Sequence, residues 1–173
     1  MKKFISQSLV VLFCAAALCA GARPAESASA SMETQRSVAP GFRLTDLNGK
    51  AVDLSSFSGK VVLIDFWATW CPPCRKMIPH LNDLYGAYRS KGFEVIGISL
   101  REELGTVKPF AQANKMVYTV AISSDGRVEQ AYGGISGIPT TFLIDKKGRI
   151  AKKMVGYHEK GILEKDIRAL LAE

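Results

Sequence analysis

The apolar residues beyond Pro40 follow a pattern that predicts strands alternating with helices. The stretch 60–67 (KVVLIDFW) is almost continuously apolar, which is typical of a strand buried on both faces in the middle of a sheet. The stretch 93–99 (FEVIGIS) predicts a second strand of this kind. Between them, apolar residues recur every three or four positions from Met77 to Tyr88, as in an amphipathic helix that Pro79 should kink.

Turn residues locate the remaining elements. Asn48-Gly49 separates the strand-like stretches 42–46 and 50–54, which predicts a tight hairpin near the start of the domain. Three further elements are expected after the strand over 93–99. They are a helix over 104–114, a strand over 118–122 and a helical turn over 127–132. The turn 145–149 (DKKGR) then joins strands over 140–144 and 150–155 in a second hairpin.

The chain is expected to end in a helix over residues 159–171. Its inner face should carry five apolar residues, which are Ile162, Leu163, Ile167, Leu170 and Leu171. Strands that alternate with helices predict a central sheet covered on both sides. Because the last two strands form a hairpin, this sheet should be mixed.

The first 30 residues have the order of a secretory signal. Lys2 and Lys3 precede the uncharged apolar run 9–20, and small residues follow at 20–22 and again at 28–30. We predict a signal peptide over residues 1–22, with residue 30 as the alternative end. An uncleaved membrane anchor is the other interpretation, although the run is shorter than the roughly 20 residues that a spanning helix needs. Both interpretations place the domain in the periplasm or otherwise outside the cytoplasm.

The rest of the chain divides into a linker and one domain. Residues 23–39 are rich in serine and alanine without an apolar period, which predicts a flexible linker, and residues 40–173 have the length of a single domain. Apolar residues make up 47% of the chain, so a wholly disordered protein is excluded. The positive charges are scattered, so we expect no binding to nucleic acid. We also expect a monomer.

The cysteines point to redox chemistry. Cys14 and Cys19 lie in the predicted signal, so the mature chain keeps only Cys71 and Cys74, which are too close together to stabilise a fold appreciably. A C-x-x-C unit between a strand and a helix indicates either a redox pair or a zinc site. A structural zinc site needs four ligands, and the chain offers no second pair. We expect a redox pair and neither a metal nor another cofactor.

The position of this pair explains how it would react. Cys71 is expected at the start of a helix, where unpaired N–H groups and the helix dipole should lower the pKa of its thiol. Pro72 and Pro73 suit the first helical turn because they need no N–H partner. Cys71 is then the exposed, attacking sulfur, and Cys74 is the partner that resolves the mixed disulfide.

At this point the chain resembles a known family. The segment 66–74 (FWATWCPPC) is similar to the active-site segment of thioredoxins, especially that of the exported TlpA/ResA-like branch. Pro79 resembles the family's helix kink, and residues 137–142 (GIPTTF) resemble its cis-proline loop. The resemblance covers about residues 40–171. It implies a thioredoxin-like fold, in which helices flank a central mixed β-sheet, with an N-terminal β-hairpin and a central insertion.

The resemblance also implies roles for particular residues. Asp65 matches a buried aspartate that could take the proton from Cys74, and burial should raise its pKa. Glu102, or Glu103 if the alignment slips by one, matches an acid that lies near the cysteines of ResA-like proteins. The expected substrate-binding residues are Trp70, Pro72, Pro73, Ile138 and Pro139. A cis bond before Pro139 would leave the backbone of Ile138 free to pair with an extended substrate.

The function implied is that of an extracytoplasmic disulfide reductase. Its clients would be protein disulfides, such as those of apocytochrome c (cytochrome c maturation) or of copper-site assembly proteins. Its electrons would come from a membrane thiol transporter. A disulfide oxidase or isomerase and a metal- or haem-delivery thiol module are the alternatives. A peroxidase is a further alternative. Ile64 and Ala68, however, stand where peroxidases of related fold place proline and threonine, so we expect negligible peroxide consumption.

Overall fold

The computed structural model describes residues 36–173. The predicted signal, with either end, and the linker up to residue 35 lie outside these residues. The described elements follow in the order β1 (Arg43–Asp46), β2 (Ala51–Asp53), η1 (Leu54–Phe57), β3 (Val61–Trp67), α2 (Pro72–Tyr88), η2 (Arg89–Lys91), β4 (Phe93–Leu100), α3 (Leu104–Ala113), β5 (Thr119–Ser123), α4 (Arg127–Ala131), β6 (Thr140–Ile144), β7 (Ile150–Val155) and α5 (Lys160–Ala172).

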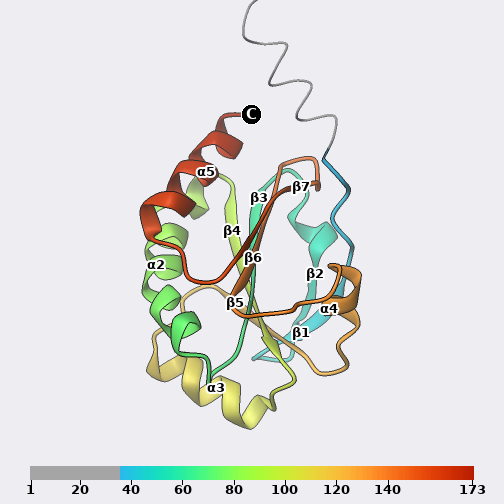
Figure 1. Cartoon of the computed structure of the whole chain (residues 1–173), viewed down its shortest axis with the longest axis vertical. Coiled ribbons are helices and arrows are strands. Elements are labelled where there is room, and N and C mark those ends of the chain that lie inside the picture. The colour runs from blue at the N-terminus through green and yellow to red at the C-terminus, as the bar shows by residue number, and fades with distance from the viewer. Residues whose placement is uncertain (1–35) are drawn as a thin grey trace, which may run out of the picture.

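The seven strands form one mixed sheet in the order β2-β1-β5-β4-β3-β6-β7 (Figure 1). β3 lies inside it, parallel to β4 and antiparallel to β6, and every residue of β3 is buried. The predicted hairpins are present as the antiparallel pairs β1–β2 and β6–β7. The thioredoxin-like fold with a mixed sheet is therefore confirmed.

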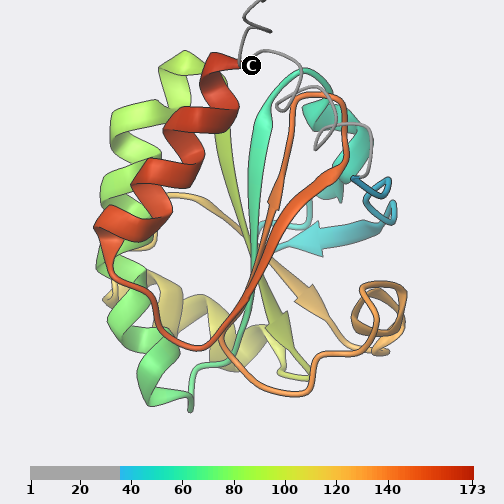
Figure 2. The ribbon, with the colours of Figure 1, turned by 45° about the horizontal axis from the view of Figure 1, so that its top comes forward.

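Helices cover both faces of the sheet, as Figure 2 shows. One face packs against α2, α3 and α5, and its core includes Leu63 and Trp67 of β3 together with both cysteines. The other face packs against η1 and α4, and its core includes Ile64 and Phe66. Successive side chains of a strand point to opposite faces, so Asp65 points to the same side as Leu63 and Trp67.

The two long helices bury most of the residues that the apolar pattern selects, and Leu171 of α5 is partly buried against the same core. In α2 the buried residues are Cys74, Met77, Ile78, Leu81, Leu84 and Tyr88, and Pro79 lies within the helix. α5 buries Leu163, Ile167 and Leu170. The prediction for Ile162 is wrong, because its side chain is 49% exposed. It lies in the first turn of α5, outside the stripe that meets the sheet.

The first described residues are attached to the domain. The N–H of Ala39 donates to the carbonyl of Gly148 at 2.9 Å, and the N–H of Ile150 donates to the carbonyl of Ser37 at 2.8 Å. Residues 36–39 thus lie along the turn between β6 and β7. Because the predicted linker extends to residue 39, its last four residues belong to the ordered domain, held by backbone bonds that apolar periodicity does not reveal.

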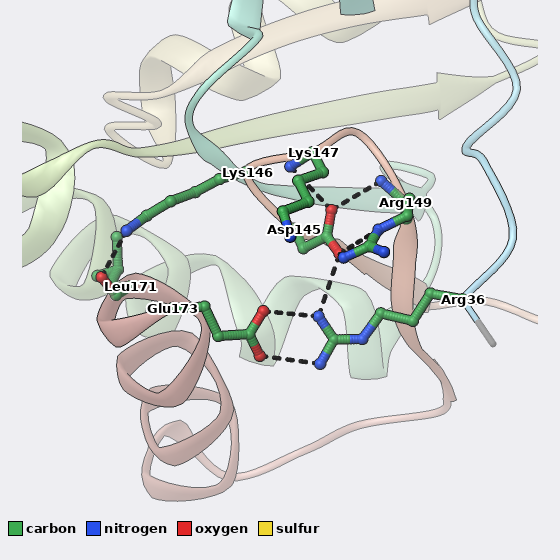
Figure 3. Close-up of polar contacts among 7 residues, drawn as sticks. All are labelled: Arg36, Asp145, Lys146, Lys147, Arg149, Leu171 and Glu173. Carbon is green, nitrogen blue, oxygen red and sulfur yellow. Dashed lines mark hydrogen bonds and ion pairs between the residues drawn. The ribbon is translucent and has the colours of Figure 1, made fainter. Parts of the chain in front are cut away.

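A charged network secures this attachment (Figure 3). The Arg36 guanidinium forms two hydrogen bonds with the Glu173 carboxylate, at 2.7 and 2.9 Å, and a third with Asp145 at 3.1 Å. Asp145 also accepts from the Arg149 side chain, and Lys146 donates to the carbonyl of Leu171. The network therefore joins the N-terminal segment, the β6–β7 turn and the end of α5.

This network and the cysteines lie at opposite ends of the sheet. β3 starts near the network and runs toward Cys71, and its seven residues span about 20 Å. In Figure 1 the end of α5 and the first described residues share one end of the molecule, away from the start of α2. Within residues 36–173, no helix is both long and apolar enough to cross a membrane.

Candidate active site

Cys71 and Cys74 form a disulfide at the start of α2, with an S–S distance of 2.03 Å. Cys71 is the N-cap residue of the helix, and Pro72 and Pro73 occupy its first turn. The N–H of Cys74 points at the Cys71 sulfur, with 3.2 Å between the two atoms. The helix start thus directs an N–H donor at the sulfur that was predicted to attack, a position that suits a negative charge.

The disulfide is less accessible than the sequence led us to expect. Cys71, predicted to be exposed, is only 2% exposed, and Cys74 is 1% exposed. The Cys71 sulfur lies 3.7 Å from the carbonyl oxygen of Ile138, so the loop before β6 covers it from one side. Trp70 does not cover it to the same extent, because its side chain is 70% exposed. Trp70 is therefore an exposed side chain directly before the buried Cys71.

The loop before β6 has the conformation that the resemblance implied. The Ile138–Pro139 peptide bond is cis. The carbonyl of Pro139 accepts the N–H of Gly156 from the end of β7, and the Thr140 hydroxyl donates to the carbonyl of Gly137. The loop is therefore held from both sides, with the backbone of Ile138 beside Cys71.

Asp65 is a buried carboxyl group in the centre of the sheet. It is 3% exposed, and it pairs across the sheet with Gly97 of β4 and Thr141 of β6. Its Oδ1 atom accepts a hydrogen bond from the Thr141 hydroxyl at 3.1 Å. Burial raises the pKa of Asp65 to about 7, against the smaller opposing effect of the Thr141 bond. Asp65 can therefore exchange a proton near neutral pH, on the sheet face that packs against the cysteines.

Polar atoms of two aromatic residues share this buried region. The Trp67 Nε1 atom is buried without a hydrogen-bond partner in the described chain. Tyr118 is buried as well, and burial together with the charge of Asp65 raises the pKa of its phenol. Gly97 allows these rings to approach the sheet, since a Cβ atom there would lie 3.1 Å from Trp67 Nε1 and 3.2 Å from Tyr118 Cε2.

Glu102, rather than Glu103, faces the loop that carries the cysteines. The Glu102 carboxylate accepts the N–H of Thr69 at 2.9 Å and also the Thr69 hydroxyl. It accepts a third hydrogen bond, from the Ser99 hydroxyl, at 2.7 Å. Glu103 is exposed and precedes α3 without capping it through its side chain. The structure thus links Glu102 to the backbone two residues before Cys71.

A groove adjoins the disulfide on the side of Trp70. It has a volume of about 630 Å³, and its walls include Trp70, Ile138, Arg101, Gly126 and Glu129. Sequence reasoning missed this groove because its walls come from four separate loops and α4. Arg101 has a positive φ of 55°, and no sequence motif predicts this conformation for an arginine. Between residues 36 and 173, no cluster of three or more histidine, cysteine or acidic side chains is arranged to hold a metal.

Comparisons with known proteins agree with this geometry. The model of the AhpC/TSA family matches residues 36–153. A thiol-disulfide oxidoreductase ResA from Bacillus thuringiensis is 40% identical over 132 residues, which are 76% of each chain. ResA from Bacillus subtilis is 37% identical over 123 residues, 71% of this chain and 68% of the relative. A thiol:disulfide interchange protein from Chlorobium tepidum superimposes with a TM-score of 0.74 at 32% identity, over 79% of this chain and 97% of that one.

Proposed function

The chain belongs to the AhpC/TSA family and is a ResA-like thiol-disulfide oxidoreductase, and from this premise we propose that it reduces client disulfides outside the cytoplasm. The observation that carries the proposal is the position of the cysteine pair. Cys71 caps α2 between Trp70 and the cis-proline loop, and the ionisable Asp65 lies on the sheet face that packs against the pair.

The proposed reaction is a pair of thiol–disulfide exchanges. In the reduced enzyme the Cys71 thiolate attacks one sulfur of the client disulfide, which breaks that bond and releases the other client sulfur as a thiolate. The Cys74 thiolate then attacks the Cys71 sulfur of the mixed disulfide. This second step releases the remaining client thiol and leaves the Cys71–Cys74 disulfide. The Cys74 N–H, aimed at the Cys71 sulfur, stabilises the attacking thiolate.

Asp65 serves the second exchange. Cys74 is buried and must lose its proton before it can attack, and Asp65 with its raised pKa accepts that proton near neutral pH. Glu102 positions the attacking sulfur, because its bonds to Thr69 fix the turn that leads to Cys71. Trp70, Pro72, Pro73 and the Ile138–Pro139 backbone form the surface on which the client lies.

The reducing direction and the partners are parts of the same proposal. The predicted export signal supports an extracytoplasmic site of action, where the surroundings oxidise thiols. The enzyme then needs a supply of electrons, for which we propose a membrane protein that transfers reducing equivalents through thiols. Clients of the class of apocytochrome c or copper-site assembly proteins fit a dithiol reductase. We propose that the chain acts as a monomer without nucleic acid or metal.

The reduction potential of the purified protein tests the direction. Equilibration with glutathione or dithiothreitol buffers, followed by quantification of Cys71 and Cys74 thiols, gives this value. We expect a potential near the thioredoxin value of about −270 mV. A potential near that of the oxidant DsbA, about −120 mV, would mean that the protein acts as a disulfide oxidase and not as a reductase. Stoichiometric metal bound to both thiols after reducing purification would instead favour the delivery module.

A further inference from the structure

Arg101 is held in a conformation that is unusual for its residue type. It follows β4 with a φ of 55°, in the left-handed region that glycine adopts readily and arginine rarely does. The N–H of Arg101 donates to the carbonyl of Ser123 at 2.9 Å, and the Ser123 hydroxyl is in turn bound by the Glu129 carboxylate. These bonds fix the backbone of Arg101 in a conformation that glycine would adopt without strain. Because an arginine nevertheless occupies this position, we infer that its side chain has a function.

The Arg101 side chain lies on the wall of the groove beside the disulfide. A Cβ atom at Gly126 would be 3.7 Å from Arg101 Nη2, so the guanidinium lies over this glycine. The same groove is bordered by Trp70 and Ile138, which flank the Cys71 sulfur. A client segment that extends from the reacting disulfide into the groove therefore passes Arg101.

Arg101 is also the cation that a client would meet there. The residue is exposed, and its guanidinium makes no hydrogen bond or ion pair with any part of the chain from residue 36 onward. The two acids in the groove are less available. Asp125 is paired with Arg127 at 2.7 Å, and Glu129 is 94% buried and bound to Ser123. The accessible charge of this groove is positive.

From these observations we propose that Arg101 is a specificity residue, which favours clients that carry an acidic side chain close to the reacting cysteine. The carboxylate would lie in the groove and pair with the guanidinium, which is the geometry that arginine recognises well. The inference rests on the proposed function and adds to it the chemical class of the client segment. Because the pair would be exposed to solvent, its contribution should be modest and sensitive to salt.

A set of model peptides tests this proposal. Each peptide carries one cysteine as a mixed disulfide with a neutral aromatic thiol, and the peptides differ only in glutamate, glutamine or lysine beside the cysteine. Stopped-flow measurement of the released thiol gives the second-order rate constant for the reduced enzyme. We expect the glutamate peptide to react about threefold to fivefold faster than the glutamine peptide at low salt, and the difference to shrink at high salt.

Variants of Arg101 separate recognition from folding. Arg101→Gly suits the left-handed backbone, so the variant should fold, reduce the glutamine peptide normally and lose the preference for glutamate. Arg101→Glu should favour the lysine peptide. Lys115→Gly is the matched control, because Lys115 also has a positive φ, 52°, but lines another groove that contains neither Trp70 nor Ile138. It should keep the wild-type preference.

Three results would overturn this proposal and leave the proposed reductase function intact. Equal rates for all peptides with the wild-type enzyme would exclude charge selection, and a preference for lysine would assign the groove to Glu129 and Asp125. A glutamate preference that survives in Arg101→Gly would place recognition elsewhere. If the reduced enzyme reacted with none of the peptides, the proposed reductase function itself would fail, and this inference with it.

Discussion

The buried carboxyl of Asp65 makes the stability of this protein depend on pH in an uncommon direction. In the unfolded chain the pKa of this group is 3.8, whereas burial raises it to about 7 in the folded protein. Between these values the folded state holds a proton that the unfolded state has lost. The free energy of unfolding therefore falls as the pH rises from about 4 to about 7, and then levels off.

The size of this effect follows from the two pKa values. Each unit of difference corresponds to about 1.4 kcal/mol, and the difference is about three units, so Asp65 should cost about 4 kcal/mol above pH 7 and almost nothing at pH 4. Asp65→Asn removes the ionisation but keeps a carbonyl oxygen for the Thr141 hydroxyl. Relative to wild type, this variant should gain stability progressively between pH 4 and pH 7.

Urea unfolding of the oxidised proteins at several pH values measures this difference. Other titrating groups are common to both proteins, so they cancel when the variant is compared with wild type. Asp83→Asn is the control for the loss of a surface carboxylate, because Asp83 is 61% exposed and its ion pair with Lys160 should contribute at most about 1 kcal/mol. A constant difference between Asp65→Asn and wild type from pH 4 to pH 8 would refute the reasoning.

Three other substitutions probe the fold and the site. Arg36→Ala removes the guanidinium that joins the N-terminal segment to two carboxylates, so urea unfolding should show a loss of about 1–3 kcal/mol; an unchanged midpoint would contradict this role. Gly97→Ala places a methyl group 3.1 Å from Trp67 Nε1 and should cost about 1–3 kcal/mol in the same assay, whereas a neutral effect would mean that the indole moves freely. Glu102→Ala removes the acceptor of the Thr69 and Ser99 hydrogen bonds, so peptide disulfide reduction should slow about tenfold, whereas a normal rate would show that Glu102 does not position Cys71.

The sequence was most informative where hydrophobic period and turn chemistry act locally. The apolar run ending at Trp67 became the central strand, and Asn48-Gly49 became the hairpin turn. The apolar strand before the cysteine pair and the helical pattern after it also predicted that the pair lies at a helix start. Each of these signals depends on neighbours within a few residues, so a single sequence contains them.

The remainder depends on contacts between segments far apart in the chain. The burial of Cys71 comes from a loop 67 residues further on, and the attachment of residues 36–39 comes from the β6–β7 turn. The strained backbone of Arg101 depends on its bond to Ser123. Periodicity within a segment carries no information about such partners, which explains why an exposed sulfur and a longer linker were predicted.

The central claim is that Cys71 attacks client disulfides and Cys74 releases the product. The most direct measurement is the capture of mixed disulfides in cells that produce the Cys74→Ser variant, in which the second exchange cannot occur. We predict adducts with exported proteins that disappear on reduction and are absent from a Cys71→Ser, Cys74→Ser double variant. If Cys74→Ser is exported normally and yields no adduct that depends on Cys71, the exchange mechanism proposed for this protein is wrong.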